Sequence, residues 1–338
     1  MVSEISTLSQ YKKEGSMRIL VVGGAGYIGS HTVKYLQENG HNCVVLDNLV
    51  FGHREAICAP HFELGDLLDK ELLDRVFERY VFDAVIHFAA FTAVGESVSS
   101  PRKYYENNVC GSLSLLNAML EHGVKNIVFS SSCAVYGEPQ YTPLDETHPY
   151  APISPYARTK LMIEEIFRDY ERAYGLRHIS LRYFNASGAA HDGSLGESHN
   201  PETHLIPLVL QAIKGTRDSI NVFGTDYDTP DGTCLRDYIH VEDLARAHAL
   251  ALDKLATFSG SINLGTGVPT SVRDIIAAAE KVTGKPCPVR YAPRREGDPA
   301  KLFAANSFAE KILEWVPHCV NIEEIIATAW HWECNKRF

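Results

Sequence analysis

The sequence lacks long hydrophobic runs, paired cysteine motifs and any excess of positive charge. No apolar stretch approaches the ~18 residues that a transmembrane helix needs, and one of the longest, residues 83–94, is interrupted by His87. Acidic residues outnumber basic residues by 42 to 32, which gives a formal net charge of -10. This balance argues against a surface that is basic overall, and we expect neither a nucleic acid nor a membrane as a partner.

The eight cysteines are scattered along the chain, and no two of them form a CxxC pair. This distribution is typical of free thiols in a reducing compartment, and we expect a cytoplasmic protein. The fifteen histidines include no HExxH motif. His199 and His204 lie five residues apart in a polar stretch, but this spacing matches no established ligand motif, so we expect no metal site.

The first residues differ from the rest of the chain. Residues 1–16 are polar and contain no apolar segment of the kind found in secretory signals. We expect them to form a disordered leader, because Met17 directly precedes the first strand-like run. With 45% hydrophobic residues over 338 positions, the chain is long enough for about two domains with substantial cores.

Short apolar runs alternate with segments of helical period between residue 17 and residue 185. Buried parallel strands read as continuous apolar runs, and strands that alternate with helices are typical of an α/β fold with a doubly wound parallel sheet. We therefore expect a Rossmann-like domain over residues 17–185. Its expected strands are 18–22, 42–47, 62–63, 84–88, 126–130 and 178–183, and its expected helices are 27–39, 70–80, 101–121 and 155–174.

The pattern becomes less regular beyond residue 185. Residues 186–203 are rich in glycine, serine, histidine and asparagine and show little periodicity, as functional loops often do. The later segments predict a smaller α/β lobe over residues 186–338, some of whose strands can rejoin the main sheet. Its expected elements are helices at 206–214, 241–254 and 271–283, a strand at 261–264 and a last helix from residue 322.

A glycine-rich loop directly follows the first expected strand. Gly23, Gly26 and Gly29 fit a GxxGxxG pattern between this strand and a helix. Glycines allow the backbone to turn tightly and to approach a pyrophosphate, and the helix offers free N–H groups and the positive end of its dipole. Because a strand and a helix flank the loop as the motif requires, the sequence predicts dinucleotide binding.

Two carboxylates indicate which dinucleotide binds. Asp47 ends the second strand, 18 residues after Gly29, where an acidic side chain accepts hydrogen bonds from the adenosine ribose and repels a 2′-phosphate. This position favours NAD over NADP. Asp66 follows the third strand and is placed to reach the adenine amino group.

A tyrosine and a lysine provide the candidate acid–base pair. Tyr156 and Lys160 are four residues apart, so they share one face of the expected helix. A tyrosine with a pKa near ~10 is a poor base, but an adjacent ammonium and a positive nicotinamide ring favour the phenolate. Residues 130–132 are three serines at the end of a strand, where a hydroxyl can bind a substrate oxygen.

Further motifs are distributed from residue 17 to residue 332. They are GGAGYIGSHT, LDNL, IHFAA, AVGES, YYENNV, SSSCAVYGE, SPYARTK, LRYFNASGA, VFGTDY, DGTCLRDYIHVEDLA, NLGTG, APRREGD and TAWHW. In these segments the chain resembles the UDP-glucose 4-epimerases, a branch of the extended short-chain dehydrogenase/reductase family. The motifs LRYFN, DGTCLRDYIHVEDLA and APRREGD are specific to the sugar-nucleotide branch rather than generic Rossmann signals.

The resemblance implies a homodimeric isomerase that inverts C4 of a UDP-hexose with bound NAD. Tyr156 would be the base, Lys160 its partner and Ser131 the hydrogen-bonding serine. Besides these three, the residues implied at the cofactor are Gly23, Gly26, Tyr27, Ile28, Gly29, Asp47, Asn48, Asp66, Leu67, Phe88, Ala89, Ala90, Thr92, Asn107 and Phe184. Besides Ser131 and Tyr156, those implied at the UDP-sugar are Asn185, His204, Leu205, Asn221, Val222, Phe223, Arg236, Arg295, Asp298 and Leu302.

Three positions depart from the pattern that the resemblance implies. Thr92 replaces a lysine near the nicotinamide ribose, and His204 with Leu205 replaces an asparagine–leucine pair beside the sugar. Leu302 replaces a tyrosine that limits the sugar pocket. A smaller side chain leaves more room near the sugar C2, so we expect N-acetylated hexoses as additional substrates.

Other activities share parts of this pattern. A UDP-pentose 4-epimerase is the nearest alternative. A sugar-nucleotide 4,6-dehydratase and a UDP-uronic acid decarboxylase are further alternatives, because both also oxidise C4. The dehydratase, however, needs carboxylates at the positions where this chain has Ser131, Ser132 and Cys133. A non-enzymatic NAD-binding protein is disfavoured, because Tyr156 and Lys160 are both present.

The implied dimer would form through the helices expected at 101–121 and 155–174. Leu113, Leu116 and Leu120 recur on one face of the first of these helices, as in a buried stripe. The alternative is that the same stripe packs within a single chain.

Overall fold

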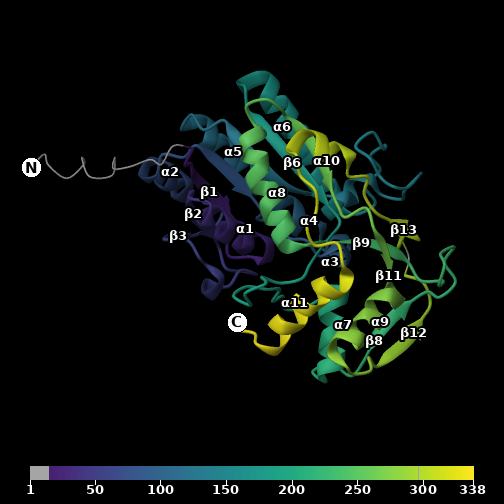
Figure 1. The fold of residues 1–338 in the computed structure, drawn as a ribbon. Helices are drawn as coiled ribbons and strands as arrows, with labels where there is room; N and C mark the ends of the chain where they lie inside the picture. The colour runs from purple at the N-terminus through teal and green to yellow at the C-terminus, as the bar shows by residue number, and fades with distance from the viewer. Residues whose placement is uncertain (1–14, 296) are drawn as a thin grey trace, which may run out of the picture.

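A seven-stranded parallel sheet forms the centre of the protein. The computed structural model describes residues 15–295 and 297–338, so residues 1–14 of the expected leader lie outside the described residues. The strand order β10-β6-β5-β4-β1-β2-β3 confirms the predicted doubly wound α/β fold (Figure 1). The strands are β1 (Arg18–Val22), β2 (Asn42–Asp47), β3 (His61–Leu64), β4 (Ala84–His87), β5 (Asn126–Ser132), β6 (Arg177–Tyr183) and β10 (Gly260–Leu264).

Helices cover both faces of this sheet (Figure 1). On one face α1 (Tyr27–Glu38) packs beside α8 (Val241–Lys254). On the other face lie α2 (Lys70–Arg79), α5 (Gly111–Glu121) and α6 (Pro155–Tyr174). The helix α8 belongs to the C-terminal half of the sequence, so both halves of the chain contribute to covering the sheet.

The strand β1 shows why the central strands are continuous apolar runs in the sequence. Ile19 and Val21 belong to the apolar layer under α1 and α8, whereas Leu20 and Val22 belong to the layer under the opposite helices. Successive side chains of a strand point to opposite faces, and here both faces are buried. A continuous hydrophobic run is therefore what this position in the sheet requires.

The helix expected at 101–121 is present, but it is not a uniform α-helix. It begins as α4 (Pro101–Tyr104), continues through a π-helical segment (Tyr105–Cys110) and ends as α5. The wider π-helical turn changes which side chains face the sheet. Such segments are frequent at functional sites, and this one contains Asn107, a residue predicted at the cofactor.

The second half of the chain adds two small sheets and their helices. One sheet has the order β11-β9-β13, with β7 also pairing with β9, and the other joins β12 to β8. The strands are β7 (Asn185–Ser187), β8 (Ile220–Phe223), β9 (Leu235–His240), β11 (Pro269–Ser271), β12 (Val289–Ala292) and β13 (Lys301–Leu302). The helices packed around them are α7 (Leu205–Lys214), α9 (Val272–Thr283) and α11 (Ile322–Cys334).

Several short elements were not expected from the sequence. They are α3 (Val94–Ser99), α10 (Ser307–Leu313), the 3-10 turns at Arg54–Ala56 and Cys133–Tyr136, and all strands of the second half other than β10. These segments are too short to show a clear hydrophobic period. Their positions depend on partners that are distant in the sequence.

The strand β10 returns from the second half of the chain to the main sheet. It pairs in parallel with β6, with Ile262 opposite Leu181. The sequence left open whether a later strand would rejoin the sheet, and β10 does so.

Two general properties of the chain can be stated from the structure. No helix within the described residues is long and apolar enough to cross a membrane. All eight cysteines are free thiols.

A buried ion pair connects α6 to the sheet. Arg182 on β6 and Glu164 on α6 are fully buried, and Nε of the arginine donates to the carboxylate at 2.9 Å. Ser131 on β5 donates to the same carboxylate at 2.5 Å, and Ser261 on β10 does so at 3.0 Å. Burial would lower the pKa of Arg182, but its hydrogen bonds and attraction to Glu164 raise it, so the guanidinium stays charged.

Replacement of Glu164 by glutamine should strongly destabilise the fold. In Glu164→Gln the fully buried guanidinium of Arg182 loses its counter-charge, and removal of one partner of a buried pair typically costs about 3–5 kcal/mol. The measurement is the free energy of unfolding in denaturant. The neighbouring Glu165→Gln, on the exposed side of α6, is the matched control and should change stability by less than about 0.5 kcal/mol. Equal stability of the two variants would contradict this account.

Candidate active site

The glycine-rich loop is packed too closely to accept side chains at two positions. Gly23 has a φ of +80°, and a Cβ there would lie 2.6 Å from the backbone nitrogen of Ala89. A Cβ on Gly29 would lie 2.2 Å from the carbonyl oxygen of Gly23. Among the described residues no side chain caps α1 at Tyr27, and its first turn holds no acidic residue. The N–H groups of this turn are therefore free to bind an anion such as a pyrophosphate.

A cleft at the carboxyl ends of β1, β2 and β3 collects many of the residues predicted at the cofactor. It is lined by Val22, Leu46, Asp47, Asn48, Gly65, Asp66, Leu67, Ala89 and Asn107. The carboxyl ends of parallel strands meet at one edge of a sheet, which is where α/β proteins bind nucleotides. The predicted adenosine contacts and the glycine-rich loop thus lie at the same edge, and these residues fit a dinucleotide.

Backbone amides hold the carboxylate of Asp47 at the end of β2. It accepts hydrogen bonds from the N–H groups of Ala25 at 3.0 Å and Leu49 at 2.8 Å. Burial raises the pKa of this carboxyl, and the two amides act in the opposite direction. Asn48, the residue after Asp47, donates to Asp66 at 2.8 Å, the residue predicted at the adenine.

Tyr156 and Lys160 lie on the buried face of α6, as predicted. The helix begins with Ser154 as its N-cap and Pro155 at its first position, which fixes where the phenol enters the site. Nζ of Lys160 donates to the carbonyl oxygen of Ser130 at 2.7 Å and lies 5.9 Å from the centre of the Tyr156 ring. The structure therefore brings the two predicted side chains together beside β5.

Burial controls the protonation of this pair. It raises the pKa of the Tyr156 phenol to about 12, although a hydrogen bond with Ser132 acts in the opposite direction. It lowers the pKa of the Lys160 ammonium to about 7, although attraction to Glu164 acts in the opposite direction. Within the protein itself, the desolvation that raises the pKa of the phenol outweighs the lowering of this pKa that we expected from the Lys160 ammonium.

The serines at the end of β5 have different surroundings. Ser131, which we expected to assist the phenol, instead donates to Glu164 in the buried ion pair. Ser132 is the serine whose hydroxyl acts on the pKa of the Tyr156 phenol. Successive side chains of a strand point to opposite faces of the sheet. One serine therefore faces the phenol, and its neighbour faces the buried ion pair.

The residues predicted around the nicotinamide lie after β4 and β6. Phe184 packs in an apolar cluster with Cys133 and Leu302. The ring of Phe88 lies 4.6 Å from that of His248, so this side chain packs into the core beside α8. Of the remaining two residues, Ala90 is half-buried and Thr92 is exposed.

Asn108 organises the loop after β4, a role that we did not anticipate. Its side chain accepts from the N–H of Phe91 at 2.9 Å and donates to Thr159 on α6 at 3.0 Å. The predicted cofactor residue Asn107 in turn donates to Asn108 at 2.9 Å. The adjacent asparagines of YYENNV were a visible signal, but the π-helical turn decides which of them faces inward.

The residues predicted at the sugar nucleotide converge from three strands of the second half. Arg236 on β9 forms an ion pair with Asp298, although the two lie 62 positions apart. Leu302 on β13 pairs with Arg236 in the strand register. Asn185 on β7 donates to the backbone of Asp237 at 2.8 Å. One small sheet therefore carries an asparagine, a guanidinium and the leucine that departs from the family pattern.

The predicted uracil contacts lie on β8 and beside β12. The guanidinium of Arg295 lies 4.3 Å from the centre of the Phe223 ring. Asn221 is exposed, whereas Val222 is buried in the core of the second half. The side chain of Val222 therefore serves packing, and only its backbone is available to a ligand.

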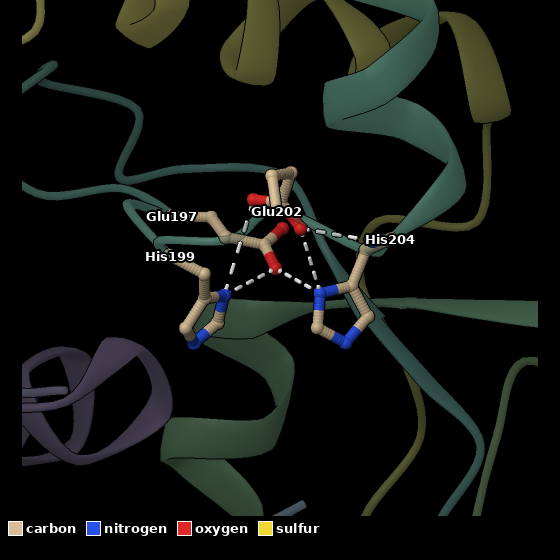
Figure 2. A group of neighbouring side chains, drawn as sticks. All are labelled: Glu197, His199, Glu202 and His204. Atoms are coloured by element: carbon tan, nitrogen blue, oxygen red, sulfur yellow. Dashed lines mark hydrogen bonds and ion pairs between the residues drawn. The ribbon is translucent and has the colours of Figure 1, made fainter. Parts of the chain in front are cut away.

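His204 and Leu205 start α7, but they have different surroundings. Leu205 packs in the core around α7 and α9. His204 pairs with two carboxylates, those of Glu197 at 2.7 Å and Glu202 at 3.0 Å (Figure 2). Burial would lower the pKa of His204, but the attraction and hydrogen bonds of these carboxylates raise it to about 10.

Comparison with known proteins agrees with this geometry. The sequence matches the model of the NAD dependent epimerase/dehydratase family over residues 19–265. It is 52% identical over 318 residues to a UDP-glucose 4-epimerase of Halalkalibacterium halodurans, and the alignment covers 94% of this chain and 95% of that relative.

Solved structures show the same likeness. The UDP-glucose 4-epimerase from Brucella ovis in complex with NAD is 50% identical, with a TM-score of 0.91 over 94% of this chain and 98% of that one. The UDP-Glc/GlcNAc 4-epimerase from Campylobacter jejuni is 43% identical, with a TM-score of 0.83 over 94% and 99% of the two chains. With its glycine-rich loop, its buried tyrosine and lysine, and this similarity over nearly the whole length, the chain belongs to the NAD dependent epimerase/dehydratase family.

Proposed function

We propose that this chain reversibly inverts C4 of a UDP-hexose with NAD as its cofactor. The observation that carries the proposal is the buried pair of Tyr156 and Lys160, whose ammonium is held by the carbonyl oxygen of Ser130 at the end of β5, next to the strand whose loop borders the nucleotide cleft. The relatives from Halalkalibacterium halodurans and Brucella ovis are both UDP-glucose 4-epimerases. The strand end carries hydroxyls and a thiol but no carboxylate, which argues against a dehydratase.

The proposed chemistry assigns one task to each group. Tyr156 accepts the proton of the sugar 4-hydroxyl as C4 is oxidised and returns it after the 4-keto sugar has turned its other face. Bound NAD would supply the acceptor for the two electrons from C4 and a positive ring that stabilises the phenolate. Ser132 holds the reacting oxygen beside the phenol, and Lys160 in its protonated form places a positive charge near both.

Rotation of the intermediate requires one end of the substrate to stay fixed. Arg236 and Arg295 are suited to this task, because guanidinium groups bind a diphosphate through two parallel hydrogen bonds. Asp298 orients Arg236 through their ion pair. Anchored at the diphosphate, the sugar is free to present either face to Tyr156.

We further propose how the chain is organised in the cell. Residues 17–185 would bind the cofactor, and residues 186–338 would bind the UDP-sugar. Free thiols at all eight cysteines support a cytoplasmic location. The proposed homodimer would form through α5 and α6. Leu116 is fully buried in the core of its own chain, so only Leu113 and Leu120 of the leucine stripe are partly exposed for such a contact.

The proposed activity can be tested by its electron balance. Purified protein should interconvert UDP-glucose and UDP-galactose without net formation of NADH, because both electrons return to the same carbon. Product separation measures the sugars, and absorbance at 340 nm measures NADH. Parallel reactions with UDP-xylose and UDP-arabinose test the pentose alternative. Accumulation of one NADH per sugar would indicate a dehydrogenase instead.

Loss of the phenol should abolish most of the activity. Tyr156→Phe keeps the ring on the buried face of α6 but removes the proton acceptor, and we expect kcat to fall by at least ~100-fold. NAD should still bind, because the glycine-rich loop is unchanged. Tyr174→Phe, an exposed tyrosine near the end of the same helix, is the control and should keep normal turnover. A folded Tyr156→Phe protein with normal turnover would exclude the assigned role.

The size of the sugar pocket should depend on Leu302. This side chain packs near Phe184 and Cys133, and Cys133 directly follows Ser132. A leucine at this position leaves more space than the tyrosine that the family pattern has there. The Campylobacter jejuni relative is a UDP-Glc/GlcNAc 4-epimerase, so a broad sugar range occurs among related proteins. We therefore propose that N-acetylated UDP-hexoses are also substrates.

Leu302→Tyr should narrow this range. The added ring would occupy the space needed by the acetamido group, so kcat/KM for the N-acetylated pair should fall by at least ~10-fold relative to the UDP-glucose pair. Leu302→Met conserves the volume and should leave the ratio of the two values unchanged. If the wild type ignores N-acetylated sugars, or if the tyrosine leaves the ratio unchanged, the pocket-size argument is wrong.

A further inference from the structure

Four potential metal ligands meet in the loop between β7 and α7. Glu197, His199, Glu202 and His204 each offer one ligand atom, and these atoms all lie within 4.8 Å of one another. Figure 2 shows the four side chains pointing toward a common centre. Both imidazoles present Nδ1 to the same oxygen of Glu197, His199 at 3.0 Å and His204 at 2.7 Å.

One oxygen in this cluster lacks a hydrogen-bond donor. The side chain of Glu202 is only 5% exposed, and its Oε2 has no hydrogen-bond partner among the described residues. Nδ1 of His199 lies 3.9 Å from this oxygen, beyond hydrogen-bond distance. A buried carboxylate oxygen without a donor is costly, so the site has an unmet requirement for positive charge.

The separations between the ligand atoms suit a small tetrahedral ion. Bonds of ~2.0–2.2 Å in a tetrahedral zinc site place the ligand atoms roughly 3.3–3.6 Å apart. The ion-pair distances in the cluster are 2.7 Å between His204 and Glu197 and 3.9 Å between His199 and Glu202, on either side of that range, and all four ligand atoms lie within 4.8 Å of one another. Side-chain rotations would therefore bring the four atoms to tetrahedral distances.

The donor set identifies the class of metal. Two imidazole nitrogens with two carboxylates suit zinc and similar divalent transition ions, whereas calcium and magnesium prefer oxygen ligands alone. The carbonyl oxygen of Glu197 accepts from the indole of Trp332 at 2.9 Å, which fixes this ligand from behind. We propose that Glu197, His199, Glu202 and His204 form a binding site for one zinc-type divalent ion.

The proposed site lies between the two ligand-binding regions of the chain. Tyr27 in the cofactor loop donates to the carbonyl oxygen of Gly188 at 2.6 Å, and its ring meets that of His199 edge-on at 6.3 Å. His204 directly precedes α7. The ion would take the place of the proton that His204 shares with the carboxylates, and it would hold this irregular loop against the cofactor loop.

His204 supplies a ligand that departs from the family pattern described above. The family pattern has an asparagine at this position, and an asparagine does not supply an imidazole nitrogen. A second cluster, formed by His191, His240 and Glu242, offers three ligands, but Nε2 of its buried histidine is already paired with Thr328 at 3.2 Å. This second cluster serves as an internal control.

The first test measures binding of zinc to the wild type. Tag-free protein is stripped with a chelator, dialysed and titrated with zinc sulfate alone in a calorimeter. We expect saturable binding of one Zn²⁺ per chain that neither Mg²⁺ nor Ca²⁺ blocks. The melting temperature should rise with zinc, because an ion that binds only the folded state stabilises it. Absence of saturable one-to-one binding overturns the proposal.

The second test removes single ligands. His204→Asn and Glu202→Gln should each weaken zinc binding by at least ~10-fold. Even substitution of residues that only hydrogen-bond to metal ligands typically lowers metal affinity by this factor or more. His191→Asn in the second cluster should bind zinc as the wild type does. Circular dichroism checks that each variant is folded. Unchanged affinity in either ligand variant, or an equal loss in His191→Asn, would overturn the assignment.

Discussion

The buried ion pair between Arg182 and Glu164 determines where the reactive groups lie. Glu164 continues the face of α6 that carries Tyr156 and Lys160, at successive spacings of four residues. When the sheet holds Glu164, it also fixes the rotation of α6 about its axis, and the phenol is directed to the end of β5. Neither charge reaches water, so each requires the other, and hydroxyls such as that of Ser131 complete the hydrogen bonds.

The sequence revealed most of the main sheet because buried parallel strands are continuous apolar runs. The helix at 155–174 was predicted to the residue, since Ser154 and Pro155 begin it and Gly175 ends it in a left-handed conformation. The π-helical turn at Tyr105–Cys110 could not be predicted, because it depends on how Asn108 binds the loop after β4 rather than on a periodic pattern.

The site was partly visible for the same reasons. Motifs identified the glycine-rich loop, Asp47 and the pair of Tyr156 and Lys160, since each motif lies within one strand, turn or helix. Which serine faces the phenol could not be read from the motif, because it depends on which face of β5 each side chain occupies, and Ser131 donates to Glu164. The contact of Arg236 with Asp298 depends on β13, a strand of only two residues. A segment this short shows no hydrophobic periodicity, so the sequence could not predict it.

The return of β10 to the main sheet links the order of synthesis to the completion of the fold. A ribosome finishes β6 at Tyr183, but the partner that covers the free edge of β6 begins only at Gly260. Until then the growing chain exposes a row of unpaired backbone groups, which is the kind of edge that invites aggregation. The nascent chain therefore passes through a stage in which this edge of β6 lacks the strand that covers it in the finished fold.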